Sequence, residues 1–263
     1  MPRTGVMPWI RRAAAAAALA FSAHAAAEAP VVAAASDLKF AAEDIAAAYR
    51  GETGKALRLV FGSSGNFYQQ IRQAAPFEIF LSADEDYVLR LAEEGLTADR
   101  GTLYAIGRIA LIAPHGSRLA VDGRLEGLRA ALAAGRIARF AIANPEHAPY
   151  GRRAQEALAH AGLWDAIRPK LVFGENVSQA AQYATSGSTE GGIVAYSLAL
   201  APPVARLGAH ALIPEDWHRP LRQRMVLLKN ASGDARRFYG YLQTPAARRI
   251  FKRHGFLLPG EEG

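Results

Sequence analysis

The stretch that decides the fold runs from an apolar segment into small polar residues and reads Leu57-Arg58-Leu59-Val60-Phe61-Gly62-Ser63-Ser64-Gly65. The apolar part predicts a β-strand that ends at Phe61, and a helix through Gln73 follows the Gly/Ser loop. A helix N-terminus presents N–H groups that lack partners, together with the positive end of the helix dipole. A strand, a small polar loop and a helix in this order therefore predict a place where an anion can bind.

Three further segments have the same arrangement of a strand end followed by a helix start. They are Ala33-Ala34-Ala35-Ser36-Asp37, Asn144-Pro145-Glu146-His147-Ala148-Pro149-Tyr150-Gly151 and Glu175-Asn176-Val177-Ser178. Ligands of open α/β sheets bind at the carboxyl ends of the strands, and several helix N-termini aimed at one point form an anion site without a cation. Each segment also has a simpler interpretation, since Ser36 could be an ordinary helix cap and the Gly62–Gly65 loop a flexible turn.

The rest of the chain alternates short apolar runs with amphipathic stretches. Strands are expected at Val31–Ala35, Ile79–Ser82, Tyr104–Ile112, Arg139–Ala143, Leu171–Phe173, Gly192–Tyr196 and Met225–Leu228. Apolar strands separated by helices predict parallel βαβ units. We therefore expect an α/β chain of two lobes, each a mainly parallel sheet flanked by helices. The strands Tyr104–Ile112 and Arg222–Leu228 are expected to cross between the lobes, so that the second lobe is inserted in the first and the site lies between them.

The first 25 residues predict a cleaved secretory signal peptide. Arg3, Arg11 and Arg12 form a positive start, an apolar run follows from Ala13 to Phe21, and Ala23-His24-Ala25 has the small residues of a cleavage site. The apolar run is shorter than the about 20 residues that a membrane span needs; an Ala-rich helix of the mature fold is the alternative. After this peptide we expect lobe I at residues 26–108, lobe II at 109–224 and the return to lobe I at 225–263.

Composition argues against several classes of function. Without the signal peptide the formal net charge falls from +7 to about +4, because three arginines and no acidic residue are removed, and no basic cluster points to nucleic acid. The chain has no Cys, which removes thiolate chemistry, and its His residues lack metal-site spacing. Ser64 has Gly62 two residues before it but Asn66 two residues after it, so it does not form a nucleophile elbow. Gly51-Glu52-Thr53-Gly54-Lys55 lacks the spacing of a phosphate loop and predicts the end of a helix.

At these residues the sequence resembles the periplasmic molybdate-binding proteins of ABC importers, within the two-lobed type II periplasmic binding protein fold. The likeness extends from about Val31 to Pro259. Six segments carry it, in this order: Ala33-Ala34-Ala35-Ser36, Gly62-Ser63-Ser64-Gly65, Phe80-Leu81-Ser82-Ala83-Asp84, Asn144-Pro145-Glu146-His147-Ala148-Pro149-Tyr150-Gly151, Gly192-Ile193-Val194-Ala195 and Ile250-Phe251-Lys252-Arg253-His254-Gly255-Phe256.

The resemblance implies that molybdate or tungstate binds between the lobes and is delivered to the membrane permease of an ABC importer. Ser36 and Ser64 would donate hydroxyl hydrogen bonds to the oxyanion, and Ser64 would also donate its backbone N–H. Tyr150 and Val177 would donate backbone N–H groups. It implies a periplasmic monomer without catalysis, cofactor or nucleic acid, whose only metal is that of the bound oxyanion.

Two residues depart from the pattern of the family. Asp37 stands where some relatives have an amide or a hydroxyl, and its carboxylate would repel a dianion. Tyr196 comes one position after the place of a donor Tyr in some relatives, and a shift of one residue along a strand reverses the side-chain face, so that role is not assigned to it. Two alternatives remain: the same fold with sulfate, thiosulfate, phosphate or an organic acid as ligand, and a periplasmic hydrolase that uses Ser64.

Overall fold

A computed structural model describes residues 29–261. The predicted signal peptide, residues 1–25, lies outside this range. Within it, no helix combines the length and the apolar character that a membrane crossing requires.

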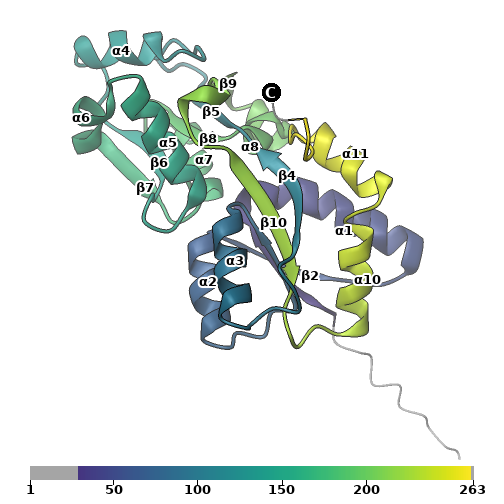
Figure 1. Ribbon diagram of the computed structural model, residues 1–263. Coiled ribbons are helices and arrows are strands. Elements are labelled where there is room, and N and C mark those ends of the chain that lie inside the picture. The colour runs from purple at the N-terminus through teal and green to yellow at the C-terminus, as the bar shows by residue number, and fades with distance from the viewer. Residues whose placement is uncertain (1–28, 262–263) are drawn as a thin grey trace, which may run out of the picture.

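The described chain forms two lobes, each built on a five-stranded sheet (Figure 1). Lobe I contains a sheet with the strand order β2-β1-β3-β10-β4. Its strands are β1 (Val31–Ala35), β2 (Arg58–Gly62), β3 (Ile79–Ser82), β4 (Thr102–Gly107) and β10 (Leu221–Leu227). Its helices are η1 (Ser36–Leu38), α1 (Lys39–Thr53), α2 (Ser64–Arg72), α3 (Glu85–Glu93), α10 (Gly233–Tyr241) and α11 (Pro245–Arg253).

Lobe II contains the second sheet, with the strand order β7-β6-β8-β5-β9. Its strands are β5 (Ile109–Pro114), β6 (Phe140–Ala143), β7 (Leu171–Gly174), β8 (Gly192–Ala195) and β9 (Gly208–Leu212). Its helices are α4 (Glu126–Ala133), α5 (Pro149–His160), α6 (Trp164–Ile167), η2 (Arg168–Lys170), α7 (Val177–Thr185), α8 (Tyr196–Leu200), α9 (Pro202–Ala205) and η3 (Glu215–Trp217).

Both sheets are mixed, with four of their five strands running in the same direction, which confirms the predicted fold class. In each sheet three strands are parallel, β2-β1-β3 in lobe I and β7-β6-β8 in lobe II, as βαβ units require. One strand of each sheet is reversed, β10 in lobe I and β5 in lobe II, and it pairs antiparallel with the strand on either side of it. The chain leaves lobe I along β4 and returns along β10, so these neighbouring strands must run in opposite directions.

The lobes are joined by two crossings of the chain (Figure 1). The first separates β4 from β5 at Arg108, so the predicted strand Tyr104–Ile112 is two strands that belong to different sheets. The second lies between β9 and β10. Strand β10 extends across the predicted boundary at residue 224, because its whole length pairs with β3 and β4 of lobe I.

The sheets place the strand ends that carry the polar loops at one cleft. Buried apolar residues cover both faces of β1, where Val32, Ala33 and Ala34 are inaccessible to solvent. The carboxyl ends of β1 and β2 in lobe I, and of β6 and β7 in lobe II, lead into η1, α2, α5 and α7. The four segments singled out in the sequence are therefore the loops that face the other lobe.

Candidate functional site

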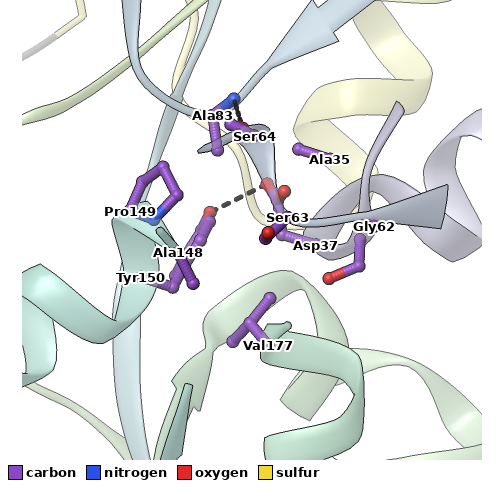
Figure 2. A pocket seen from close by; sticks show the side chains of 11 residues that line it. Ala35, Asp37, Gly62, Ser63, Ser64, Ala83, Ala148, Pro149, Tyr150 and Val177 are labelled. Atoms are coloured by element: carbon purple, nitrogen blue, oxygen red, sulfur yellow. Dashed lines mark hydrogen bonds between the residues drawn. The ribbon is translucent and has the colours of Figure 1, made fainter. Parts of the chain in front are cut away.

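A small pocket lies between the lobes and is lined by all four segments (Figure 2). Its cavity volume is about 10 Å³, which is far below the roughly 300–1,000 Å³ of sites for drug-sized ligands. The lining residues are Ala35, Ser36, Asp37, Gly62, Ser63, Ser64, Ala83, Ala148, Pro149, Tyr150 and Val177. None of these is Lys, Arg or His. A pocket of this size and lining suits a small inorganic ion rather than a sugar or a peptide.

Ser36 follows β1 directly, and its hydroxyl points toward lobe II. The backbone N–H of Ser178 donates to Ser36 Oγ at 3.3 Å, and the hydroxyl of Ser178 donates to the carbonyl of Ser36 at 2.8 Å. Ser36 is only 3% exposed. Because Ser36 Oγ accepts from Ser178, its own proton remains to be donated into the pocket.

Ser64 is the first residue of α2 and is completely buried. Its Oγ accepts a hydrogen bond of 2.9 Å from the backbone N–H of Ala83 (Figure 2), so its proton is likewise available as a donor. Ser63, the preceding residue, is the N-cap of this helix and accepts from Asn66 N–H. The cap leaves the N–H of Ser64 as one of the first-turn groups that have no partner within the helix.

Tyr150 and Val177 lie in the first turns of α5 and α7, on the lobe II side of the pocket. Pro149 begins α5, where its lack of an N–H costs nothing, so Tyr150 contributes the first N–H of that helix. Asn176 caps α7 and accepts from the N–H groups of Ser178 and Gln179. Val177 N–H is not among those that the cap accepts. First-turn N–H groups are the ones that an oxyanion can accept from.

Asp37 is the unexpected member of this lining, because it is a buried acid among neutral donors. Its Oδ2 accepts from the hydroxyl of Tyr150 at 2.9 Å and from Nε2 of Gln223 at 2.6 Å. The amide of Gln223 is fixed in turn, since its Oε1 accepts from the hydroxyl of Tyr104 at 2.7 Å. Asp37 Oδ1 is buried and accepts no hydrogen bond.

Burial raises the pKa of Asp37 from 3.8 to about 6. The hydrogen bonds from Gln223 and Tyr150, and the N–H dipoles of Asp37 and Leu38, favour the charged form and partly offset this effect. The pKa values of Tyr150 and Tyr104 are raised well above their ordinary value, first by burial and then by the nearby carboxylate of Asp37. Both phenols are therefore neutral donors at physiological pH.

The two lobes are in direct contact around the pocket. The N–H of Gly65 in α2 donates to the carbonyl of His147 in lobe II at 2.9 Å, and Ser63 Oγ lies 2.9 Å from His147 Nδ1. Farther out, Arg153 Nη2 lies 3.5 Å from Asp84 Oδ2. The structure is thus a closed form, in which residues of both lobes surround the pocket.

The structure places all four predicted site residues, Ser36, Ser64, Tyr150 and Val177, around this one pocket. It does not bring Tyr196 there: that side chain packs against Arg108 and His210 instead. Sequence reasoning missed the phenol of Tyr150 as a partner of Asp37, and it missed Gln223, which comes from a crossing strand far along the chain. Among residues 29–261, no three His, Asp or Glu side chains gather as a metal site.

Comparison with known proteins gives matches over nearly the whole described chain. A family model described as "Bacterial extracellular solute-binding protein" matches residues 30–257. The chain is 36% identical to the molybdate-binding protein ModA of Rhodobacter capsulatus over 219 residues, which are 82% of this chain and 83% of that protein. The periplasmic molybdate-binding protein of Azotobacter vinelandii has a solved structure similar to this one, with a TM-score of 0.79 and 30% identity, covering 88% of this chain and 100% of that chain.

The fold is also shared with a protein named for another ligand. The sulfate-binding protein SubI of Mycobacterium tuberculosis aligns with a TM-score of 0.72 at 14% identity, over 89% of this chain and 88% of that chain. The likeness to SubI concerns the fold alone, so the architecture by itself does not select the anion.

Proposed function

This chain belongs to the family of bacterial extracellular solute-binding proteins and has the two-lobed type II periplasmic binding protein fold, and on that premise we propose that it captures molybdate or tungstate between its lobes. The oxyanion would be held by the hydroxyls of Ser36 and Ser64 and by the backbone N–H groups of Ser64, Tyr150 and Val177. Relatives that are 30–36% identical to this chain are named molybdate-binding protein, which supports this choice of ligand.

The observation that carries the proposal is the convergence of neutral donors from four strand ends on one small pocket. Hydrogen bonds to a charged group contribute about 1.5–3 kcal/mol each. A handful of them, after the costs of ordering and desolvation, is enough for micromolar to nanomolar affinity. Neutral donors suit an anion that is fully deprotonated and must later be released.

Capture would proceed by closure of the lobes. In an open form the anion would first meet Ser36 and Ser64 of lobe I, and closure would then bring Tyr150 and Val177 of lobe II onto it. The contacts of His147 with Ser63 and Gly65 would hold the closed form. The cavity size would select against smaller oxyanions, because the same donors cannot contract around them without strain.

The family places this chain among solute-binding transport proteins. The finer proposals are a periplasmic location reached through a cleaved signal peptide at residues 1–25, delivery to the permease of an ABC importer, and action as a monomer without nucleic acid. Lobe closure supports the importer proposal, since a permease could distinguish the loaded, closed form from the open one.

We propose that the chain has no enzymatic activity. In the described residues Ser64 Oγ is hydrogen-bonded to a backbone N–H rather than to a base, and the nearby imidazole of His147 contacts Ser63 instead. Ser63 Oγ is itself engaged as the cap of α2. Turnover of an ester substrate that is lost in Ser64→Ala would contradict this proposal.

The test is the thermal midpoint of the mature protein with molybdate, tungstate, sulfate, thiosulfate and phosphate at equal concentrations. A ligand that binds only the folded state stabilises it by about 2.7 kcal/mol at a hundredfold excess over Kd. We expect a large shift with molybdate and tungstate only. A shift restricted to another oxyanion would replace the substrate and keep the fold, and no shift with any of them would reject the oxyanion site.

A further inference from the structure

An acid that lines a pocket for a dianion needs an explanation. Asp37 is 1% exposed, lies beside the proposed donors (Figure 2), and has one oxygen without a hydrogen-bond partner. A carboxylate at this position would repel molybdate at close range in a medium of low polarity. A buried oxygen that makes no hydrogen bond is itself costly. Both costs vanish if the unpartnered oxygen carries a proton and donates a hydrogen bond to the bound anion.

We propose that Asp37 binds the oxyanion as the neutral carboxylic acid, with Oδ1–H as a further donor, so that the protein takes up one proton for each anion captured. This inference rests on the proposed function and adds to it a coupling between ligand affinity and pH. The only covalent bond formed is the O–H bond at Asp37 Oδ1. Its proton comes from solvent, and the oxyanion stays deprotonated.

The hydrogen bonds around Asp37 identify the oxygen that would carry the proton. Oδ2 already accepts from two donors, the phenol of Tyr150 and the amide of Gln223. Gln223 presents its N–H₂ side because its Oε1 is occupied by the hydroxyl of Tyr104. A proton on Oδ2 would face these donors, whereas Oδ1 accepts no hydrogen bond that a proton there would displace. The network therefore leaves Oδ1 as the oxygen that can donate.

The side chains that face Asp37 are neutral. They therefore do not gain or lose a proton in the pH range in which Asp37 does. Among the described residues they are Tyr150 from α5, Tyr104 from β4, Gln223 from β10, and Ser197 from α8, whose hydroxyl donates to the Asp37 carbonyl at 2.8 Å. Helix α7 presents Val177 and Ser178. On α1, the adjacent Lys39 is paired with Glu43 at the surface.

The titration of Asp37 in the closed, ligand-free structure agrees with this arrangement. Burial raises the pKa of Asp37 to about 6, so the acid is mostly ionised at about pH 7.5 before the ligand arrives. A dianion placed against it disfavours the ionised form further. The pKa of Asp37 thus rises on binding, and the rise equals proton uptake.

The experiment is calorimetric titration of the mature, full-length protein with sodium molybdate in two buffers of the same pH, about 7.5, and different ionisation enthalpies. The difference in heat gives the number of protons taken up. The Kd is also measured from about pH 6.5 to 8.5. Wild type should take up close to one proton at pH 7.5, and its Kd should rise about tenfold per pH unit above the pKa of the free acid.

Two variants locate the proton. Asp37→Asn supplies a permanent N–H donor of nearly the same shape, so it should take up no proton and its Kd should not vary with pH. Asp86→Asn removes the same charge from an exposed position of lobe I and should behave as wild type. Thermal midpoints of both variants establish that they are folded.

Each alternative outcome overturns a defined claim. If wild type binds molybdate without proton uptake and with a Kd independent of pH, the inference is wrong and the proposed function stands. The inference is also wrong if Asp37→Asn takes up the same number of protons as wild type. If wild type binds neither molybdate nor tungstate at any of these pH values, the proposed function itself fails, and the inference with it.

Discussion

The phenol of Tyr150 in lobe II donates a hydrogen bond of 2.9 Å to Oδ2 of Asp37 in lobe I. This contact joins the two lobes inside the pocket, at the place where the ligand is proposed to bind. It therefore connects three properties of the protein: the closed arrangement of the lobes, the protonation of Asp37, and the donors available to the anion. A change in any one of them should be measurable in the other two.

Asp37→Asn should stabilise the ligand-free protein above about pH 6. The pKa of the folded acid is about 6 and its ordinary value is 3.8, so the folded state holds this proton more tightly than the unfolded chain does. The stability contribution of the neutral acid is present at low pH and is lost as pH rises from about 4 to above 6. The full loss is on the order of 3 kcal/mol.

Since Asn cannot ionise, the variant avoids that loss. Its thermal midpoint should exceed that of wild type by several degrees at about pH 7.5 and match it near pH 4. Midpoints measured by circular dichroism over this range check the prediction. A difference between the two proteins that does not vary with pH would contradict it.

Ser36→Ala should weaken molybdate binding without unfolding the protein. The lost hydroxyl donor contributes about 1.5–3 kcal/mol, which corresponds to a rise in Kd of about 10- to 150-fold. The N–H of Ser178 loses Ser36 Oγ but keeps Asn176 Oδ1 at 3.1 Å, so the thermal midpoint of the free protein should change little.

Ser64→Ala is the informative contrast. It removes the same kind of donor but also strips the buried N–H of Ala83 of its partner, so it should lower both the affinity and the thermal midpoint. Ser188→Ala, at an exposed position, is the control and should change neither. Calorimetry together with thermal melts separates the three variants, and wild-type affinity in both pocket variants would disprove the site.

The sequence predicts the parts of the site that depend on local signals. A strand end followed by small polar residues and a helix start marks Ser36, Ser64, Tyr150 and Val177, because each signal lies within a few adjacent residues. The helix end at Gly54 is found in the same way, and the structure confirms it: Gly54 takes a left-handed conformation with φ of 71° and closes α1.

What the sequence does not reveal depends on contacts between distant segments. Gln223 reaches Asp37 across 186 residues of chain, and nothing near Gln223 in the sequence points to an acid. The strand predicted at Tyr104–Ile112 is divided because its two halves join the sheets of different lobes. At the division, the guanidinium of Arg108 donates to the Gly255 carbonyl at 2.8 and 3.1 Å. Helix α4 and strand β9 were missed as well.

Tyr150→Phe should weaken molybdate binding moderately while the backbone N–H of residue 150 remains in place. The variant removes two hydrogen bonds between the lobes, from the phenol to Asp37 Oδ2 and from Gln223 Nε2 to the phenol oxygen. At about 1 kcal/mol each, Kd should rise about 5- to 30-fold. Asp37 also loses a donor that favours its charged form, so the pH above which affinity falls should move upward.

The matched control is Tyr183→Phe in α7, outside the pocket. It should leave both Kd and its pH profile as in wild type. If Tyr150→Phe changes the affinity but not the pH profile, the phenol acts on lobe closure alone and not on Asp37.

Gly65→Ala should keep the fold and prevent full closure of the lobes. A Cβ at residue 65 would lie 2.5 Å from the carbonyl oxygen and 2.9 Å from the Cα of His147 in the other lobe, and 2.8 Å from the hydroxyl of Tyr87. Two of these atoms are backbone and cannot swing aside, so the closed form must open slightly at a cost of about 1–3 kcal/mol.

Opening relieves both contacts with the His147 backbone, and the one that remains is with the hydroxyl at the far end of the Tyr87 side chain in the same lobe. Within α2 an Ala is preferred over Gly by about 0.5–1 kcal/mol. The ligand-free variant should therefore melt at or above the wild-type temperature, while its Kd for molybdate rises by about 5- to 150-fold. Gly240→Ala in α10 is the control, because its Cβ would have no atom within 4 Å, so it gains the helix preference alone and binds as wild type. Small-angle scattering with molybdate bound should show a larger radius of gyration for Gly65→Ala than for wild type. A variant that binds and compacts like wild type would show that the contact between Gly65 and His147 does not control closure.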